Sequence, residues 1–488
     1  MTARRNFYLA AAESYLGVII GLLSTVVLAR LLTPTEIGTF SVAASFTGLA
    51  HAFRELGVGN YIVQEKELTD ERIRAAFTVS LLAAWPVGAA LLVASPWVAQ
   101  FYRNPQLTPI LVVLAANFFL LPFGSVTLAC LRRSMLFGRG LIINVSGSAV
   151  RVAASIALAL AGMGALSLAL GASAGLLATV ILATILRPRR LPWLPGRREL
   201  HRVLKFGLTV TGGSLAGSAN EAAPDLVIGK VLGAADTGMF NKALGLATMI
   251  NNLIMQPLWK FMMPYFSERS RSGENVAPIY LRIVSVVTGF TWPALVTAAV
   301  AADPIVRLLL GSQWLDAIPI ARILCVAVAS GAAFSPMSSF LIARSRADLY
   351  LRAATLAFFF RAGFLLVTVW FGLQMVAWGF VGGALANACY AAYLLRRYMS
   401  IGVRDLLRSC ERSVLLSAMV APVALGAMWL SFEFELAPIL SLMTVFAASA
   451  MSWLLVVSRV HPAAAVEVFH VMRKASERLR IGRLRSGS

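Results

Sequence analysis

Residues 28–40, LARLLTPTEIGTF, return two hundred residues later as IGKVLGAADTGMF at 228–240. The two stretches align without a gap, and each ends a long apolar segment. Corresponding positions carry related residues: Arg30 and Lys230, Leu32 and Leu232, Glu36 and Asp236, Gly38 and Gly238, Phe40 and Phe240. A repeat of this length in an apolar chain predicts a duplicated membrane bundle, the arrangement that transporters use to form a site between two lobes.

The composition also indicates a membrane protein. The chain is 59% hydrophobic and 13% charged, with a mean hydropathy of +0.77, well outside the range of soluble domains of this size. Apolar runs long enough to cross about 30 Å of hydrocarbon recur throughout. We therefore predict an all-α polytopic protein with about fourteen transmembrane helices: 7–32, 37–63, 73–97, 106–130, 141–161, 164–186, 203–232, 237–265, 278–301, 316–343, 349–371, 374–395, 411–431 and 437–458.

Lys and Arg cluster in alternate connections, and this pattern predicts the orientation. Loops rich in Lys and Arg stay in the cytoplasm, so both termini are expected there. The net charge of +21 then reflects topology and attraction to anionic lipids. Because the basic residues are spread over many loops rather than over one folded face, no nucleic-acid partner is expected. The four cysteines and four histidines show no metal-type spacing.

The spacing of the two copies, which start two hundred residues apart, predicts the domain organisation. An even number of spans separates the copies, so both enter the membrane in the same direction, as in parallel repeats. We predict five parts in chain order: an N-lobe at 1–187 with helices one to six, a basic cytoplasmic linker at 188–202, a C-lobe at 203–398 with helices seven to twelve, helices thirteen and fourteen at 399–459, and a basic cytoplasmic tail at 460–488. A helix on the inner membrane surface is the preferred interpretation of the tail, and a partner-binding segment is the alternative.

Two stretches resemble a known family. Residues 28–64 run from an apolar helix through a turn with Pro and acidic-x-Gly to a helix ending in acidic-Leu-Gly-x-Gly, and 225–243 carry Asp225, Ile228, Gly229, Gly233, Gly238 and Ala243. The chain resembles the polysaccharide transporter family, the Wzx-like oligosaccharide flippases of the multidrug/oligosaccharidyl-lipid/polysaccharide exporter superfamily. Weaker likeness continues to about residue 400. Residues 239–242, Met-Phe-Asn-Lys, depart from the family pattern, so Lys242 is a candidate contact for this chain's own substrate. The resemblance implies export of a lipid-linked sugar chain across a bacterial inner membrane, and it leaves the sugar open.

Basic residues inside the predicted spans are the main candidates for a substrate site. A charge at a helix centre costs roughly 2.5–3.5 kcal/mol on insertion scales, so such residues normally face a cavity or a partner. Arg151 and Arg361 lie mid-helix at corresponding places in the two lobes and suit a pyrophosphate, because Arg binds phosphate oxygens bidentately. Pairing with an acid on another helix is the alternative. The full candidate set is Arg151, Arg361, Lys242, Arg322 and Arg54, with Asn252 and Gln256 from a polar stripe; snorkelling competes for Arg54.

The acids inside the spans are fewer. Glu221 and Asp225 are four residues apart, hence on one face of the seventh predicted helix, beside the helix-bending Pro224. Carboxylates at membrane depth make these two candidates for an H⁺ or Na⁺ coupling site. A structural pairing of Asp225 with Lys230 or Lys242 is the alternative. No other cofactor, no catalytic residue and no metal site is expected.

Four classes of protein compete at this point. A multidrug exporter of the same fold favours an acidic or aromatic cavity, and a peptidoglycan lipid-precursor flippase shares the cationic one. A membrane glycosyltransferase or polymerase needs a large outward loop with acids, but the longest predicted outward connection, 302–315, holds only Asp303. We expect a non-enzymatic flippase for a polyprenyl-pyrophosphate-linked oligosaccharide, with membrane lipids and a polysaccharide polymerase or export machinery as partners.

The orientation can be tested with reporter fusions. Fusions near Asp303 or Glu433 should report a periplasmic location, and fusions near Arg190, Arg346 or Ser488 a cytoplasmic one, because basic loops are retained inside. Alkaline phosphatase and green fluorescent protein activities measure the two cases. A cytoplasmic signal at Glu433 would contradict the helix count.

Overall fold

The computed structural model describes residues 2–188, 195–196, 199–271, 277–343 and 346–460. Apart from short 3-10 and π turns, the regular structure of these residues is α-helical, with no strand. Ten of the described helical segments are long and apolar enough to cross a membrane. They include every predicted span except the first, second, seventh and eighth, which correspond to the long helices α1, α2, α8 and α9. The chain is a multi-pass membrane protein. The predicted tail lies outside the described residues, apart from Val460.

The described residues form two compact units. The first contains Met1–Asn241 and Leu309–Gln313; the second contains Lys242–Leu308 and Trp314–Ser488. The first unit thus includes α8 and the start of α9. The boundary of these two units differs from the boundary between the predicted lobes. The five-part division into lobes, linker and tail stays a prediction.

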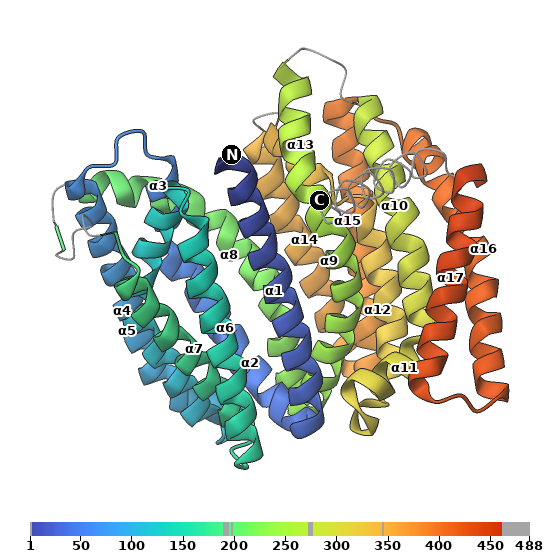
Figure 1. Cartoon of the computed structure of the whole chain (residues 1–488), viewed down its shortest axis with the longest axis horizontal. Helices are drawn as coiled ribbons and strands as arrows, with labels where there is room; N and C mark the ends of the chain where they lie inside the picture. The colour runs from blue at the N-terminus through green and yellow to red at the C-terminus, as the bar shows by residue number, and fades with distance from the viewer. Residues whose placement is uncertain (1, 189–194, 197–198, 272–276, 344–345, 461–488) are drawn as a thin grey trace, which may run out of the picture. The chain divides into compact units, whose positions relative to one another are not determined.

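In the first unit, α6 packs along α7, α4 along α5, and α1 against α6, while α2 packs on α8 (Figure 1). Apolar side chains of α2, α4, α5 and α7, including Val42, Leu107 and Ala169, form one of its cores. The helices are α1 (Thr2–Leu31), α2 (Pro34–Glu55), α3 (Val58–Gln64), α4 (Asp70–Tyr102), α5 (Leu107–Arg133), α6 (Phe137–Leu160), α7 (Ala165–Ile185) and α8 (Leu200–Val231).

In the second unit, α10 packs on α16, α14 on α15, and α16 on α17. Its core includes Tyr280, Phe340 and Leu395, all at most 2% exposed. The helices are α9 (Ala234–Arg271, which begins in the first unit), α10 (Ala277–Val300), α11 (Ala302–Ile305), α12 (Ala317–Ala332), α13 (Met337–Ala343), α14 (Ala347–Thr368), α15 (Leu373–Met399), α16 (Val403–Glu433) and α17 (Pro438–Val460).

Two predicted spans are each broken into two helices. The span 37–63 is interrupted because Leu56 and Gly57 have φ angles of 32° and 56°, which end α2 before α3 begins. The span 316–343 is interrupted by a turn ending at Pro336, and the residue before a proline is disfavoured in the helical region. The short junctions predicted near 162 and 372 are real turns, with Gly162 at φ 81° and Gly372 at φ 93°.

The two copies of the repeat turn the chain by different means. In the first copy, Thr33 caps α2: its hydroxyl accepts from the Glu36 amide, while the Glu36 carboxylate accepts from the Thr33 amide at 2.8 Å. This reciprocal capping box satisfies two otherwise orphaned amides. In the second copy, Gly233 at φ 102° ends α8, a conformation that favours glycine.

The two repeat turns then pack directly on each other through corresponding glycines. A Cβ placed on Gly38 would lie 1.7 Å from the carbonyl oxygen of Ala234, and one placed on Gly238 would lie 2.1 Å from that of Pro34. Ala234 and Pro34 are themselves repeat equivalents, so the contact is a pseudo-twofold crossing, hereafter the glycine crossing. Backbone-to-backbone packing of this kind leaves no room for a methyl group.

Alanine at either glycine should therefore destabilise the protein. We expect Gly38→Ala and Gly238→Ala each to cost about 1–3 kcal/mol or more from overpacking, read as a lower unfolding temperature in detergent. Gly48→Ala on α2 and Gly245→Ala on α9 are matched controls, because nothing lies within 4 Å of a Cβ at either position. Equal unfolding temperatures for Gly38→Ala and Gly48→Ala would contradict the glycine crossing.

Candidate functional site

Helix α6 has an apolar side and a polar side. Ile142 and Leu160 are 47% and 69% exposed, as expected of residues facing lipid. Arg151 lies nine residues from each, which is two and a half turns and hence the opposite side of the helix. It is also exposed, and no described residue forms a hydrogen bond or ion pair with its guanidinium. A charged side chain on the side away from lipid normally faces water or a polar ligand.

Arg361 has a comparable position on α14. Phe359 and Leu366, which are 60% and 55% exposed, lie about 160° and 140° around the helix from it. The Arg361 guanidinium is 5.0 Å from the centre of the Phe380 ring on α15. An aromatic face stabilises a cation without neutralising it.

Both arginines lie where two helices pack closely against each other. A Cβ on Gly175 of α7 would lie 2.5 Å from the Arg151 Cβ, and one on Gly383 of α15 would lie 3.1 Å from the Arg361 Cα. In each unit, the arginine is therefore anchored where the following helix approaches through a glycine. This shared setting agrees with the repeat, and binding of one pyrophosphate by both arginines stays a prediction.

The other predicted substrate contacts differ in how exposed their side chains are. Lys242 is half-buried, while Arg322 on α12 and Asn252 on α9 are exposed. Arg54, near the end of α2, is partly buried. The side chain of Gln256 lies outside the described part of the structure. Each of these stays a predicted substrate contact.

Asp225 lies in a polar contact between α8 and α2. Its carboxylate accepts from the Ser45 hydroxyl at 3.0 Å and from the Asn241 amide at 3.4 Å. None of the ion pairs between described residues includes Asp225. Lys230 instead donates to the Phe101 carbonyl and lies 4.0 Å from the centre of that ring.

Glu221 lies one turn before Asp225 and is exposed. The described residues hold no group of three or more His, Cys, Asp and Glu side chains that could bind a metal ion. The role of Glu221 and Asp225 in ion coupling stays a prediction.

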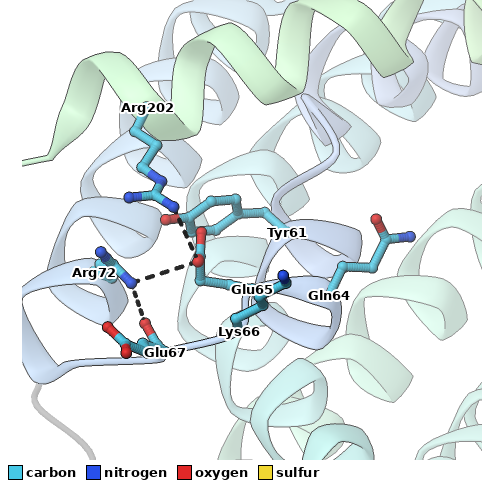
Figure 2. A pocket seen from close by; sticks show the side chains of 7 residues that line it. All are labelled: Tyr61, Gln64, Glu65, Lys66, Glu67, Arg72 and Arg202. Carbon is cyan, nitrogen blue, oxygen red and sulfur yellow. Dashed lines mark hydrogen bonds and ion pairs between the residues drawn. The ribbon is translucent and has the colours of Figure 1, made fainter.

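A polar cavity of about 640 Å³ lies at the α3–α4 connection of the first unit (Figure 2). Its lining is Tyr61, Gln64, Glu65, Lys66, Glu67, Arg72 and Arg202. The Glu65 carboxylate accepts from Arg202 at 3.2 Å and from Arg72 at 3.4 Å. Because Arg202 lies in the first turn of α8, this carboxylate ties α8 to the connection between α3 and α4.

Glu65 is held in its charged form. Burial alone raises the pKa of its carboxyl, but the hydrogen bond from Tyr61 and the charges of Arg202 and Arg72 outweigh burial, so the pKa lies below its ordinary value. A lowered carboxyl pKa stabilises the fold at neutral pH, and this contribution is lost only as the pH falls through the lowered pKa.

Arg133, at the end of α5, holds the same connection from its other side. Its guanidinium donates to the backbone carbonyls of Ile62, Val63, Glu65 and Lys66. Ile62 and Val63 lie in the last turn of α3, whose carbonyls cationic donors commonly satisfy, and Glu65 and Lys66 follow it directly. From the sequence, the charges of Arg72, Arg133 and Arg202 indicate only that their connections lie in the cytoplasm.

Comparison with known proteins identifies the family. The sequence profile described as "Polysaccharide biosynthesis protein" matches residues 27–319, which is more than half of the chain. The chain belongs to this family.

Several curated proteins are similar in sequence. The lipopolysaccharide biosynthesis protein WzxC of Escherichia coli (strain K12) is 25% identical over 68% of this chain and 68% of its own. The teichuronic acid biosynthesis protein TuaB of Bacillus subtilis (strain 168) is 22% identical over 91% of this chain and 92% of its own. The succinoglycan biosynthesis transport protein ExoT of Rhizobium meliloti (strain 1021) is 24% identical over 64% and 63%.

Two solved structures share the fold. The lipid II flippase MurJ in an inward closed conformation aligns with a TM-score of 0.74 at 13% identity, over 92% of this chain and 98% of its own. An inward-facing multidrug resistance MATE transporter of the MOP superfamily aligns with a TM-score of 0.61 at 17% identity, over 79% and 94%. At these identities the likeness shows the fold, as the resemblance of the sequence implied.

Substitution of the two mid-helix arginines should abolish transport without unfolding the protein. We expect Arg151→Ala and Arg361→Ala each to lower export of surface polysaccharide at least about tenfold, and lysine to restore it only in part, because lysine lacks the bidentate fork. Surface polymer and membrane-protein level are measured together. Arg352→Ala is a matched control, since Arg352 is exposed on α14 nine residues from Arg361. Wild-type export by both alanine variants would show that these arginines are structural.

Proposed function

We propose that this chain moves a polyprenyl-pyrophosphate-linked oligosaccharide across the bacterial inner membrane by alternating access, for the biosynthesis of exopolysaccharide, capsule or O-antigen. The observation that carries the proposal is Arg151, exposed and without a partner among the described residues on the side of α6 away from its exposed apolar residues. Family membership and relatives named for polysaccharide biosynthesis or transport support it.

The chemistry of such a substrate suits a cationic interior. Its headgroup is large, polar and doubly phosphorylated, so it cannot cross hydrocarbon unaided, whereas its polyprenyl tail can stay in the bilayer. Guanidinium groups bind phosphate oxygens through paired hydrogen bonds. Because every lipid of this class carries the pyrophosphate, arginines would bind them all, and recognition of the glycan must come from neutral or acidic polar groups.

The proposal includes the cellular setting. Both termini would lie in the cytoplasm, since the basic connections are retained there. The substrate would be assembled on that side and used on the other, by a polymerase or an export machinery as partner. Catalysis forms no part of the proposal; the work of the chain is binding and conformational change.

Asp225 is the proposed coupling site for H⁺ or Na⁺, with Glu221 one turn away. Its carboxylate has two neutral hydrogen-bond donors and no ion pair among the described residues, so a proton or a sodium ion could neutralise it at modest cost. If it couples transport to a gradient, Asp225→Asn should still bind substrate but should lose gradient-driven transport.

Deletion in the native host tests the function. We expect loss of one surface polysaccharide together with accumulation of its lipid-linked unit on the inner leaflet, because the unit is made but not moved. Surface glycan analysis and extraction of the lipid-linked pool measure the two effects. An unchanged surface with new sensitivity to cationic drugs would support a multidrug exporter. A loss of peptidoglycan synthesis would support a peptidoglycan lipid-precursor flippase.

A further inference from the structure

An acid and an amide meet where α1 packs against α6 in the first unit. The Asn144 side-chain amide on α6 donates to the Glu13 carboxylate on α1 at 2.6 Å, and both residues are partly buried. Glu13 has no ion pair with a described basic residue. Asn144 lies in a helix that is long and apolar enough to cross a membrane. A carboxylate beside such a helix is costly, and one hydrogen bond from a neutral amide offsets little of that cost.

The pair belongs to the same polar side of α6 as Arg151. Asn144, Ser148, Arg151 and Ser155 follow at spacings of four, three and four, which places them along one stripe. Asn144 precedes Arg151 by seven residues, about 10 Å along the helix axis. Ile142 and Leu160, both exposed, mark the opposite side. Glu13 and Asn144 therefore lie on the side of α6 that carries the proposed phosphate contact.

The sign of the charge determines what each end of the stripe can bind. An ionised carboxylate accepts hydrogen bonds and repels phosphate, while an amide both donates and accepts. Sugar hydroxyls donate and accept in the same way. We propose that Glu13 and Asn144 bind hydroxyl groups of the oligosaccharide and determine which glycan is carried. This inference rests on the proposed function and extends it from the pyrophosphate to the sugar.

A purely structural role makes a different prediction. If the pair only holds α1 against α6, its loss should lower the stability of the protein and affect all ligands alike. If it binds sugar, its loss should affect only glycosylated ligands, because a polar site built for hydroxyls discriminates strongly by those hydroxyls. Glu13→Gln separates the two roles, since glutamine is nearly isosteric and can still accept a hydrogen bond from Asn144.

The experiment compares two probes on the purified full-length chain. One is the lipid-linked oligosaccharide extracted from the deletion host, and the other is the sugar-free polyprenyl pyrophosphate. We expect Glu13→Gln and Asn144→Ala to weaken binding of the glycosylated probe about tenfold to a hundredfold, the effect of losing a hydrogen bond to a charged group. Both variants should bind the sugar-free probe as the wild type does. Arg151→Ala should weaken both probes.

Ser146→Ala is the matched control, because Ser146 lies two residues beyond Asn144 on another side of α6. Unchanged binding of the glycosylated probe by Glu13→Gln, or equal weakening of both probes together with a lower unfolding temperature, overturns the inference while leaving the proposed function intact. A wild-type chain that binds neither probe overturns the proposed function itself.

Discussion

Hydrocarbon excludes charge, and most features of this protein follow from how it meets that constraint. Three charged residues in the long helices have polar or aromatic neighbours: Glu13 beside Asn144, Asp225 beside Ser45 and Asn241, and Arg361 against Phe380. Arg151 is different, because the described part of its surroundings supplies no hydrogen bond or ion pair. Its position opposite Ile142 and Leu160 places it away from the side of α6 that is expected to face lipid. A residue of this kind is explained by a ligand more simply than by the fold.

The glycine crossing gives the repeat a physical meaning. Residues two hundred apart in sequence pack on each other at Gly38 and Gly238, with the carbonyls of Ala234 and Pro34 filling the space that side chains would need. The turns that lead into it differ in chemistry, since one relies on the Thr33 cap and the other on the positive φ of Gly233. The same backbone path is thus reached twice. The glycine crossing joins α2 to α9, and the hydrogen bond from Ser45 to Asp225 joins α2 to α8, the helix before the second turn.

Sequence reasoning could predict the helices and the repeat, because hydropathy and loop charge act locally. It could not predict the break at Leu56–Gly57, where the backbone conformation follows from packing rather than from composition. It also could not find the contact between Glu13 and Asn144, which are 131 residues apart, because periodicity shows which side of a helix is polar but not which helix it faces. The same holds for Arg133: its charge predicts its side of the membrane, whereas only the fold brings it to the end of α3.

Transport by the purified chain tests the central claim most directly. Proteoliposomes with lipid-linked oligosaccharide in the outer leaflet, and an imposed ion gradient, would be treated with a membrane-impermeant glycosidase, and the protected fraction would be measured over time. The account predicts that the wild type protects a growing fraction of the glycan. The fraction protected by vesicles with Arg151→Ala should stay close to that of empty vesicles. A wild type that protects no more than empty vesicles under either an H⁺ or a Na⁺ gradient would contradict it.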